Sequence, residues 1–391
     1  MHEGEAANVP VRPLHVDPTG CMANRALPLD FLLHDRLAPR IGAVEVALPD
    51  HWYPQAELFA ALMKRWGGRH RNLERLASLY RNVGVNARHV ALPIEEYETL
   101  SSFGRANDAF IRVGTELGAR AVKGALAARG LAPADVGAIF FTTVTGLAVP
   151  TIDARLVNVL GLRRDVRRTP LFGLGCVGGA AGLARAADWL RAYPDEVAVL
   201  LSVELCTLTL QDDFSVANLI ASGLFGDGAA AVVVTGARTG RTGNGTGLAP
   251  RVVASKSAFF PDTERVMGWD IDEHGFRVVL SADVPDIVRT HMRAEVDAFL
   301  TEHGLSRGDI DQWVCHPGGP KVISAMEEAL ALPPDALDVT RRSLAEIGNL
   351  SSASVLHVLA ETTRTRARAG DVGVLLAMGP GFCAEMVLLE W

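Results

Sequence analysis

The strongest constraint on the fold is an alternation, from Ile41 onward, of short β-branched or apolar runs with longer segments rich in Ala, Leu and Arg. Short continuous apolar runs indicate buried strands, and the longer segments indicate helices. In the first half, the predicted buried strands are 138–143, 169–172, 197–203 and 229–234, and the predicted helices are 107–129, 152–161 and 177–191. Strands that alternate with helices form a layered sheet that is covered on both faces. The sequence therefore predicts an α/β fold.

A glycine-rich segment, 235–247, is the clearest break in composition. It lacks the Gly-Lys-Ser/Thr ending of a phosphate-binding P-loop, and no helical pattern follows it directly, so we interpret it as a connector. The alternation then resumes, with strands expected at 252–257, 276–280, 372–376 and 384–389 and helices at 285–303, 319–331 and 350–366. We therefore expect a loosely ordered N-terminal extension, 1–37, and two halves of similar make-up, 38–240 and 241–391.

Composition argues against several classes of protein. The net charge of −7 over 391 residues lacks the basic bias of a nucleic-acid binder. Five scattered cysteines form neither a disulfide framework nor a C-x-x-C zinc site, so a reducing compartment is expected and no metal is predicted. The N-terminus has no basic region followed by an apolar core, and no run approaches the roughly 18 apolar residues of a spanning helix. We expect a cytoplasmic protein without integral membrane association.

Cys176 lies in the segment Phe172-Gly-Leu-Gly-Cys176-Val-Gly-Gly-Ala180, which indicates a strand, a tight elbow and the start of a helix. At such an elbow, backbone N–H groups and the helix dipole lower a thiol pKa and favour the nucleophilic thiolate. The alternative is a small buried core residue, which is the commonest role of a free cysteine. On this segment alone, the two interpretations are equally supported.

Two segments of the second half supply partners for a reactive thiol. In the first, a strand ends in His316 and breaks into a Pro-Gly-Gly-Pro turn. Strand ends are where α/β folds hold ligand-binding groups. In the second, Asn349 lies in a turn before a small-residue helix, where its side chain could donate an N–H into a cavity. Taken singly, His316 could instead brace its turn, and Asn349 could cap the helix.

Five motifs contain these residues or accompany them. In chain order they are Gly-Cys176, Leu224-Phe-Gly-Asp-Gly-Ala-Ala-Ala231, His316-Pro-Gly-Gly-Pro320, Gly348-Asn-Leu-Ser-Ser352 and Gly379-Pro-Gly381. On these motifs, the chain from about residue 40 to its C-terminus resembles the type III polyketide synthases, the chalcone synthase-like branch of the thiolase-fold condensing enzymes. The resemblance implies acyltransferase activity and a thiolase-like layered αβαβα fold built from two similar halves.

The resemblance also implies a role for each of the three residues. Cys176 takes an acyl group from a coenzyme A thioester and holds it as an enzyme thioester. His316 is the partner of the thiolate and, with Asn349, donates hydrogen bonds to the carbonyl of incoming malonyl-CoA. Loss of CO2 leaves an enolate that both donors stabilise, and the enolate carbon attacks the acyl group. Coenzyme A thioesters are the substrates, and no cofactor is implied.

Other positions match the walls of the family's substrate cavity. Phe225 matches a gatekeeper phenylalanine, whereas Val278 stands where a second one is expected, unless a shift brings Phe276 there. Cys206 stands where plant members have a cavity-lining threonine. Further substrate-binding positions are implied at Val149, Thr209, Gly318, Gly319, Ser351, Gly379, Pro380, Gly381, Arg75 and Arg81. Val149 and Pro150 match a loop that in relatives enters the partner's cavity, so a homodimer is implied.

The walls of this cavity favour a particular starter. Val278, Cys206 and Ala377-Met-Gly-Pro-Gly381, in place of Gly-Phe-Gly-Pro-Gly, predict a medium- or long-chain fatty acyl starter and closure to an alkylpyrone or alkylresorcinol. A malonyl- or aromatic-primed synthase is the alternative within the family. A ketoacyl synthase usually carries Gln-Ala-Asn after the histidine, and a papain-type hydrolase has a different cysteine signature. An inactive thiolase-fold binding protein is the non-enzymatic alternative, against which the three intact residues argue.

Overall fold

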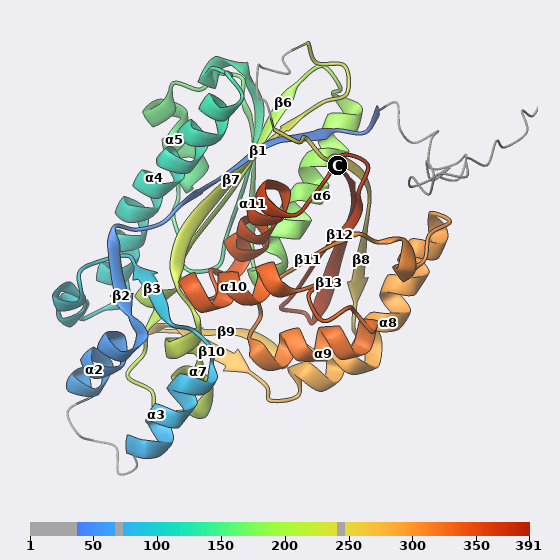
Figure 1. The fold of residues 1–391 in the computed structure, drawn as a ribbon. Helices are drawn as coiled ribbons and strands as arrows, with labels where there is room; N and C mark the ends of the chain where they lie inside the picture. The colour runs from blue at the N-terminus through green and yellow to red at the C-terminus, as the bar shows by residue number, and fades with distance from the viewer. Residues whose placement is uncertain (1–36, 67–72, 241–246) are drawn as a thin grey trace, which may run out of the picture.

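The computed structural model of the protein describes residues 37–66, 73–240 and 247–391, so the predicted extension lies almost wholly outside the described residues. A nine-stranded sheet forms its centre, in the order β11-β12-β13-β8-β1-β7-β6-β4-β5 (Figure 1). Its strands are β1 (Arg40–Ala47), β4 (Val136–Thr143), β5 (Arg167–Phe172), β6 (Val197–Leu205), β7 (Asp227–Thr235), β8 (Arg251–Phe259), β11 (Gln312–Cys315), β12 (Val372–Gly379) and β13 (Cys383–Glu390). Two further pairs stand apart, β2 (His51–Pro54) with β3 (Ala87–Val90) and β9 (Met267–Asp272) with β10 (Gly275–Leu280).

The two halves of the central sheet repeat one pairing pattern. In the first half, β1 pairs antiparallel with β7, β7 antiparallel with β6, and β6 parallel with β4. In the second half, β8 pairs antiparallel with β13, β13 antiparallel with β12, and β12 parallel with β11. A single pairing, Arg40 of β1 with Arg251 of β8, joins the halves.

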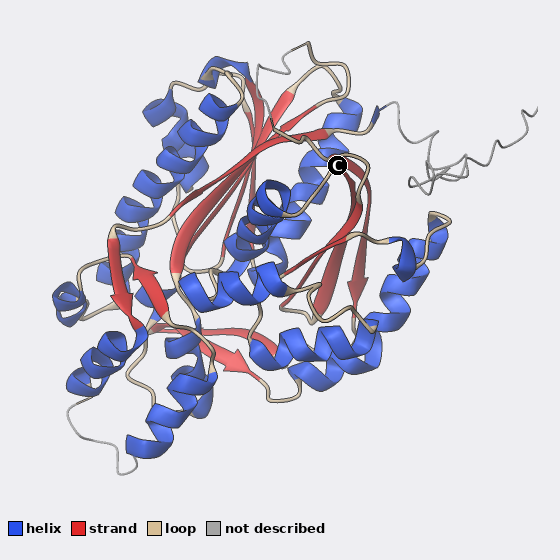
Figure 2. Ribbon diagram, viewed as in Figure 1, coloured by secondary structure: helices blue, strands red, loops and turns tan. Residues whose placement is uncertain are grey.

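Helices cover both halves in layers, as Figure 2 shows. The outer helices are α4 (Phe103–Ala128) and α5 (Ile152–Leu160) on the first half and α8 (Val284–Glu302) and α9 (Pro320–Leu330) on the second. Two helices, α6 (Gly178–Ala192) and α11 (Ser354–Thr365), lie between the halves and contact strands of both. The others are α2 (Gln55–Arg65), α3 (Leu73–Asn82), α7 (Val216–Leu224) and α10 (Asp338–Ile347). This arrangement confirms the predicted thiolase-like αβαβα fold of two similar halves.

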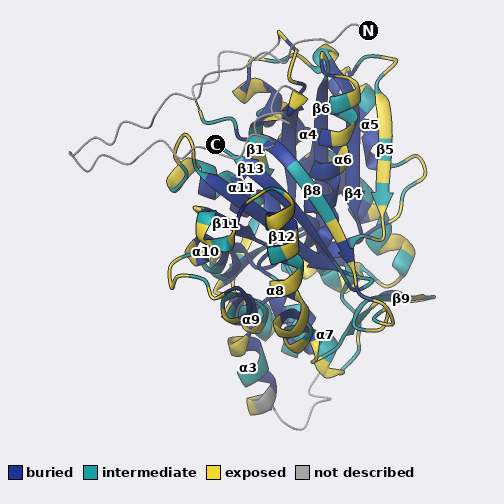
Figure 3. Cartoon of the chain, turned by 90° about the vertical axis from the view of Figure 1, so that its right-hand side faces the viewer, coloured by how far each residue is buried: buried dark blue, intermediate teal, exposed yellow. Residues whose placement is uncertain are grey.

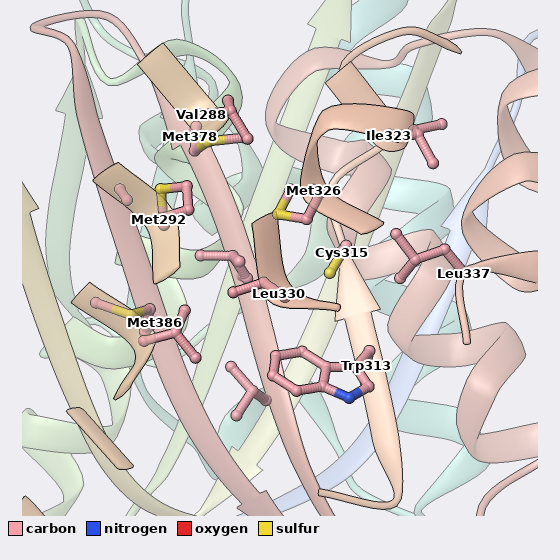
Figure 4. Packing of buried hydrophobic residues seen from close by; sticks show 14 of the residues in the cluster. Val288, Met292, Trp313, Cys315, Ile323, Met326, Leu330, Leu337, Met378 and Met386 are labelled. Atoms are coloured by element: carbon pink, nitrogen blue, oxygen red, sulfur yellow. The ribbon is translucent and has the colours of Figure 1, made fainter. Parts of the chain in front are cut away.

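The core of the second half packs α8 and α9 against the sheet. Figure 4 shows Met292 of α8, Met326 of α9 and Met386 of β13 within one buried cluster. Cys315 belongs to the same cluster and is 0% exposed. This cysteine, although it directly precedes His316, is therefore a core residue.

One predicted element differs from the structure. The sequence predicts a buried strand at 169–172, but no residue of β5 is buried (Figure 3). β5 stands at the end of the strand order and pairs only with β4 in the described chain. Pro170 suits such an edge, because it has no N–H to donate to a further strand. The prediction of burial is therefore wrong for this strand.

Two kinds of feature are absent from the described residues. Their helices include none that is both long and apolar enough to cross a bilayer. Their His, Cys, Asp and Glu side chains form no group of three or more that could hold a metal ion.

Candidate active site

Cys176 lies in the 3₁₀ turn Gly175–Val177, between β5 and α6, which is the predicted elbow. It is 6% exposed. Gly175 adopts a φ of +55°, and a Cβ there would lie 2.5 Å from Cδ of Pro380, so this position requires glycine. A Cβ on Gly379 would lie 2.8 Å from the backbone nitrogen of Val177. The end of β12 is therefore packed directly against the turn that carries the cysteine.

Asn349 and Ser351 bring a second turn, just before α11, to the thiol. Sγ of Cys176 lies 3.8 Å from Oγ of Ser351, within hydrogen-bonding distance for sulfur. Oδ1 of Asn349 accepts from the backbone N–H of Ser351 at 2.8 Å and from Oγ of Ser354 at 3.4 Å. Because Oδ1 is occupied in this way, the Nδ2 amide is the end of Asn349 that can donate to the site.

His316 follows β11 and is held by its backbone. Its N–H donates to the carbonyl of Leu376 in β12 at 2.9 Å, and its own carbonyl accepts from Gly318 at 2.9 Å. The imidazole is 2% exposed, and within the described parts of the chain neither ring nitrogen has a hydrogen-bond partner. Buried polar atoms are nearly always paired, so this ring is available to a group that the free chain does not supply.

Burial shifts the pKa values of Cys176 and His316 in opposite directions. It raises the pKa of Cys176 to about 12, an effect that hydrogen bonds with Ser351 and Asn349 partly offset. It lowers the pKa of His316 to about 3. Each group taken alone is therefore neutral at pH 7. The prediction that the elbow and the helix dipole lower the thiol pKa is wrong for the isolated thiol, because burial has the larger effect.

Glu204 is a buried residue of the site that the sequence did not reveal. It lies in β6 and is 0% exposed. Its carboxylate accepts from the backbone N–H of Val144 at 3.1 Å, from Thr145 Oγ1 at 2.9 Å and from Ser352 Oγ. Burial raises its pKa to about 7. The sequence signal that could have revealed Glu204 is that it is the single acidic residue of a largely apolar strand. A buried carboxylate in such a strand needs polar partners from distant segments.

A cavity of about 170 Å³ lies beside this site. Four predicted positions line it, namely Phe225, Val278, Cys206 and Thr209. Phe276, the alternative to Val278, does not line it; its ring is buried against those of Phe103 and Trp269. Aromatic lining residues that were not predicted are Tyr80, Tyr97 and Trp269.

Phe225 connects the cavity to the turn that carries Asn349. The backbone N–H of Gly226 donates to the carbonyl of Asn349 at 2.9 Å, and the N–H of Asn349 donates to the carbonyl of Leu224 at 2.9 Å. The carbonyl of Phe225 accepts from the guanidinium of buried Arg88. The predicted gatekeeper and the predicted donor are thus fixed to each other.

The remaining predicted positions do not line the cavity. Gly318 and Gly319 lie between His316 and α9, and Gly381 follows Pro380 in the turn before β13. Val149 is 99% exposed. Arg81 is exposed on α3, and Arg75 lies in the same helix with its side chain outside the described part of the structure.

The chain matches known proteins over nearly its whole described length. Residues 39–238 match the N-terminal domain of chalcone and stilbene synthases, and residues 251–391 match the C-terminal domain. It is 54% identical over 355 residues to a 1,3,6,8-tetrahydroxynaphthalene synthase of Streptomyces peucetius subsp. caesius, covering 90% of this chain and 93% of the relative. It is 31% identical over 362 residues to a 3,5-dihydroxyphenylacetyl-CoA synthase of Amycolatopsis orientalis, covering 90% and 93%.

A solved structure agrees with these matches. The crystal structure of 1,3,6,8-tetrahydroxynaphthalene synthase from Streptomyces coelicolor A3(2), a bacterial type III polyketide synthase, superposes with a TM-score of 0.83. The two are 31% identical, and the match covers 90% of this chain and 99% of the other. The chain therefore belongs to the chalcone and stilbene synthase family and is a type III polyketide synthase.

Proposed function

We propose that Cys176 carries the growing acyl chain and that His316 and Asn349 stabilise the enolate formed when malonyl-CoA loses CO2. The observation that carries this proposal is the buried imidazole of His316, whose ring nitrogens have no partner within the described residues. A substrate thioester oxygen would pair with that ring and with Nδ2 of Asn349. Donors aimed at a developing negative charge in a dry site are the main source of catalysis in such reactions.

Loading begins with a proton transfer from the Cys176 thiol to His316. Burial penalises each charge separately, but their mutual attraction in a dry site offsets this cost when both form together. The thiolate attacks the acyl carbon of the starter, and coenzyme A leaves with the proton from His316. Malonyl-CoA then loses CO2, and the C–C bond electrons form the enolate. The enolate carbon attacks the thioester carbonyl, the Cys176 thiolate leaves, and the chain is two carbons longer.

We further propose that malonyl-CoA is the starter as well as the extender. The Streptomyces peucetius relative, at 54% identity, is named for a bicyclic product that has no alkyl chain. The cavity of about 170 Å³ is smaller than the ~300–1,000 Å³ typical of pockets for drug-sized ligands. Trp269 stands directly opposite Val278 in the pairing of β9 with β10 and lines the same cavity. Its indole therefore occupies part of the cavity space that the small side chain of Val278 leaves.

The fatty acyl starter remains the second candidate, and the small side chain of Val278 in the cavity lining supports it. When the enzyme is given malonyl-CoA together with acyl-CoA starters of graded length, we expect a single product. Its mass should not change with the length of the acyl-CoA. Trp269→Ala enlarges the cavity and should raise incorporation of longer starters about 10-fold or more. Trp52→Ala, a change of the same kind at a 53% exposed position, is the control. A wild-type product whose mass follows the acyl-CoA length would replace the malonyl starter with the fatty acyl one.

We also propose that two copies of the chain associate through the face that carries Val149. Leu147, Val159 and Phe172, on segments next to this position, are 40%, 51% and 50% exposed, and Val149 is 99% exposed. Apolar side chains beside β5, the last strand in the order of the described sheet, suit a self-complementary interface. In sedimentation velocity, the wild type is expected at the mass of two chains, and Val149→Asp should shift it towards one. A wild type with the mass of one chain at micromolar concentration contradicts the proposal.

A further inference from the structure

A chain of hydrogen bonds leads from the cavity wall to a buried carboxylate. Oη of Tyr97 is hydrogen-bonded to Oγ1 of Thr207, which donates to Oδ2 of Asp227. Tyr97 and Thr207 both line the cavity, whereas Asp227 is 0% exposed and does not. A proton at the tyrosine can therefore reach a carboxylate that a ligand in the cavity cannot touch.

The carboxylate is fixed as an acceptor. The N–H of Ala91 donates to Oδ2 of Asp227 at 2.6 Å, and the N–H of Thr207 donates to Oδ1 at 2.8 Å. Burial raises the pKa of Asp227 to about 6, although these hydrogen bonds and the charge of Arg88 lower it. Among the described residues, Tyr97 and Cys206 also face it. Burial raises both pKa values; Asp227 raises that of Tyr97 further, and Glu204 and then Asp227 raise that of Cys206 further. A base with a pKa near neutrality suits reversible proton transfer.

We propose that Tyr97, Thr207 and Asp227 form a proton relay that closes the ring of the polyketide held in the cavity. The inference rests on the proposed function, in which a chain of alternating carbonyl and methylene carbons is assembled on Cys176. Such a chain needs a base to remove a methylene proton and an acid to protonate the oxygen of the attacked carbonyl. In this arrangement Tyr97 contacts the substrate, and the other two residues act through it.

The proton that passes from Tyr97 to Asp227 in the first step returns along the same path in the second. Oη of Tyr97 accepts a proton from a methylene carbon while its own proton passes to Thr207, and the proton of Thr207 passes to Asp227. The carbanion attacks a ketone carbon, a C–C bond forms, and the C=O π bond breaks to give an alkoxide. Tyr97 then donates its proton to the alkoxide as Asp227 returns its proton through Thr207. The enzyme is restored, and no oxidant or reductant is consumed.

The test measures cyclised product per CO2 released, with whichever starter the wild type accepts. Tyr97→Phe removes one hydroxyl and Thr207→Val breaks the relay at constant volume, and each should lower this ratio about 100-fold. Thr207→Ser, which keeps the hydroxyl, should restore it. In the wild type the ratio should fall as the pH drops through about 6, where Asp227 becomes protonated, and in Asp227→Asn it should not vary with pH over that range.

Tyr193→Phe, a matched change at a 40% exposed position after α6, is the control and should leave the ratio unchanged. The relay is overturned if Tyr97→Phe and Thr207→Val keep the ratio within twofold of the wild type. It is also contradicted if Thr207→Ser lowers the ratio as much as Thr207→Val does, because a hydroxyl at this position would then not be enough to support ring closure. If malonyl-CoA is not the starter, the mass of the wild-type product will show this independently of the ratio measured here.

Discussion

Replacing Cys176 with alanine is expected to abolish the acyl-enzyme and to lower polyketide formation by ~10³-fold or more. We propose this thiol as the nucleophile because the elbow presents it beside Ser351 and Asn349, unlike the other two buried cysteines of the described chain. Cys206 belongs to the cavity wall, and Cys315 belongs to the core of the second half. Acid-quenched samples incubated with labelled malonyl-CoA would show the loss by mass spectrometry.

The same variant separates loading from decarboxylation. In the proposed mechanism, enolate formation depends on the donors His316 and Asn349, so CO2 release from malonyl-CoA should persist in Cys176→Ala at a measurable rate. Cys206→Ser is the matched control, because it changes a second buried cysteine and should still form the acyl-enzyme on Cys176. Continued chain extension by Cys176→Ala would remove the cysteine from the mechanism.

Changes to the two donors are expected to lower CO2 release from malonyl-CoA about 10²- to 10³-fold each. Asn349→Asp keeps an oxygen where Oδ1 accepts from the N–H of Ser351, so the turn is retained while the donor is replaced by a negative charge. His316→Ala removes the ring. His316→Gln provides an amide donor but no base, so it should release CO2 faster than His316→Ala and still load Cys176 poorly.

Release of radiolabelled CO2 and the amount of quenched acyl-enzyme measure these two steps independently. His291→Gln, the same chemical change at an exposed histidine of α8, is the control and should alter neither step. Equal loading in His316→Gln and the wild type would show that the imidazole is not the base. Full CO2 release by Asn349→Asp would show that the amide is not a donor.

The sequence predicted the long, strongly patterned elements well. Strands such as β4, β6 and β7 are buried along their whole lengths, so their apolar runs are continuous and easily found. The exposure of β5 depends on its place at the edge of the sheet, which its own short sequence does not reveal. Short elements such as β2, whose exposed residues alternate with half-buried ones, carry too little pattern to be predicted.

The proposed catalytic residues could be picked out because they lie in local motifs, whereas their environment could not be predicted. Glu204 is paired with Thr145 and Ser352, which lie far from it in the chain. Trp269 faces Val278 only because of the register of a hairpin. The pKa of Cys176 depends on burial by segments from both halves, so a local argument from the helix dipole gave the wrong sign.

The most direct test of Cys176 as the acyl carrier is to quench the wild-type enzyme with acid during turnover of ¹³C-labelled malonyl-CoA alone and to analyse its tryptic peptides. Trypsin cleaves after Arg168 and Arg185, so Cys176 and Cys206 fall in different peptides. We expect labelled acyl groups on the Cys176 peptide, with masses that rise in two-carbon ketide steps. Product formation with no label on that peptide, or with label only on the Cys206 peptide, would contradict it.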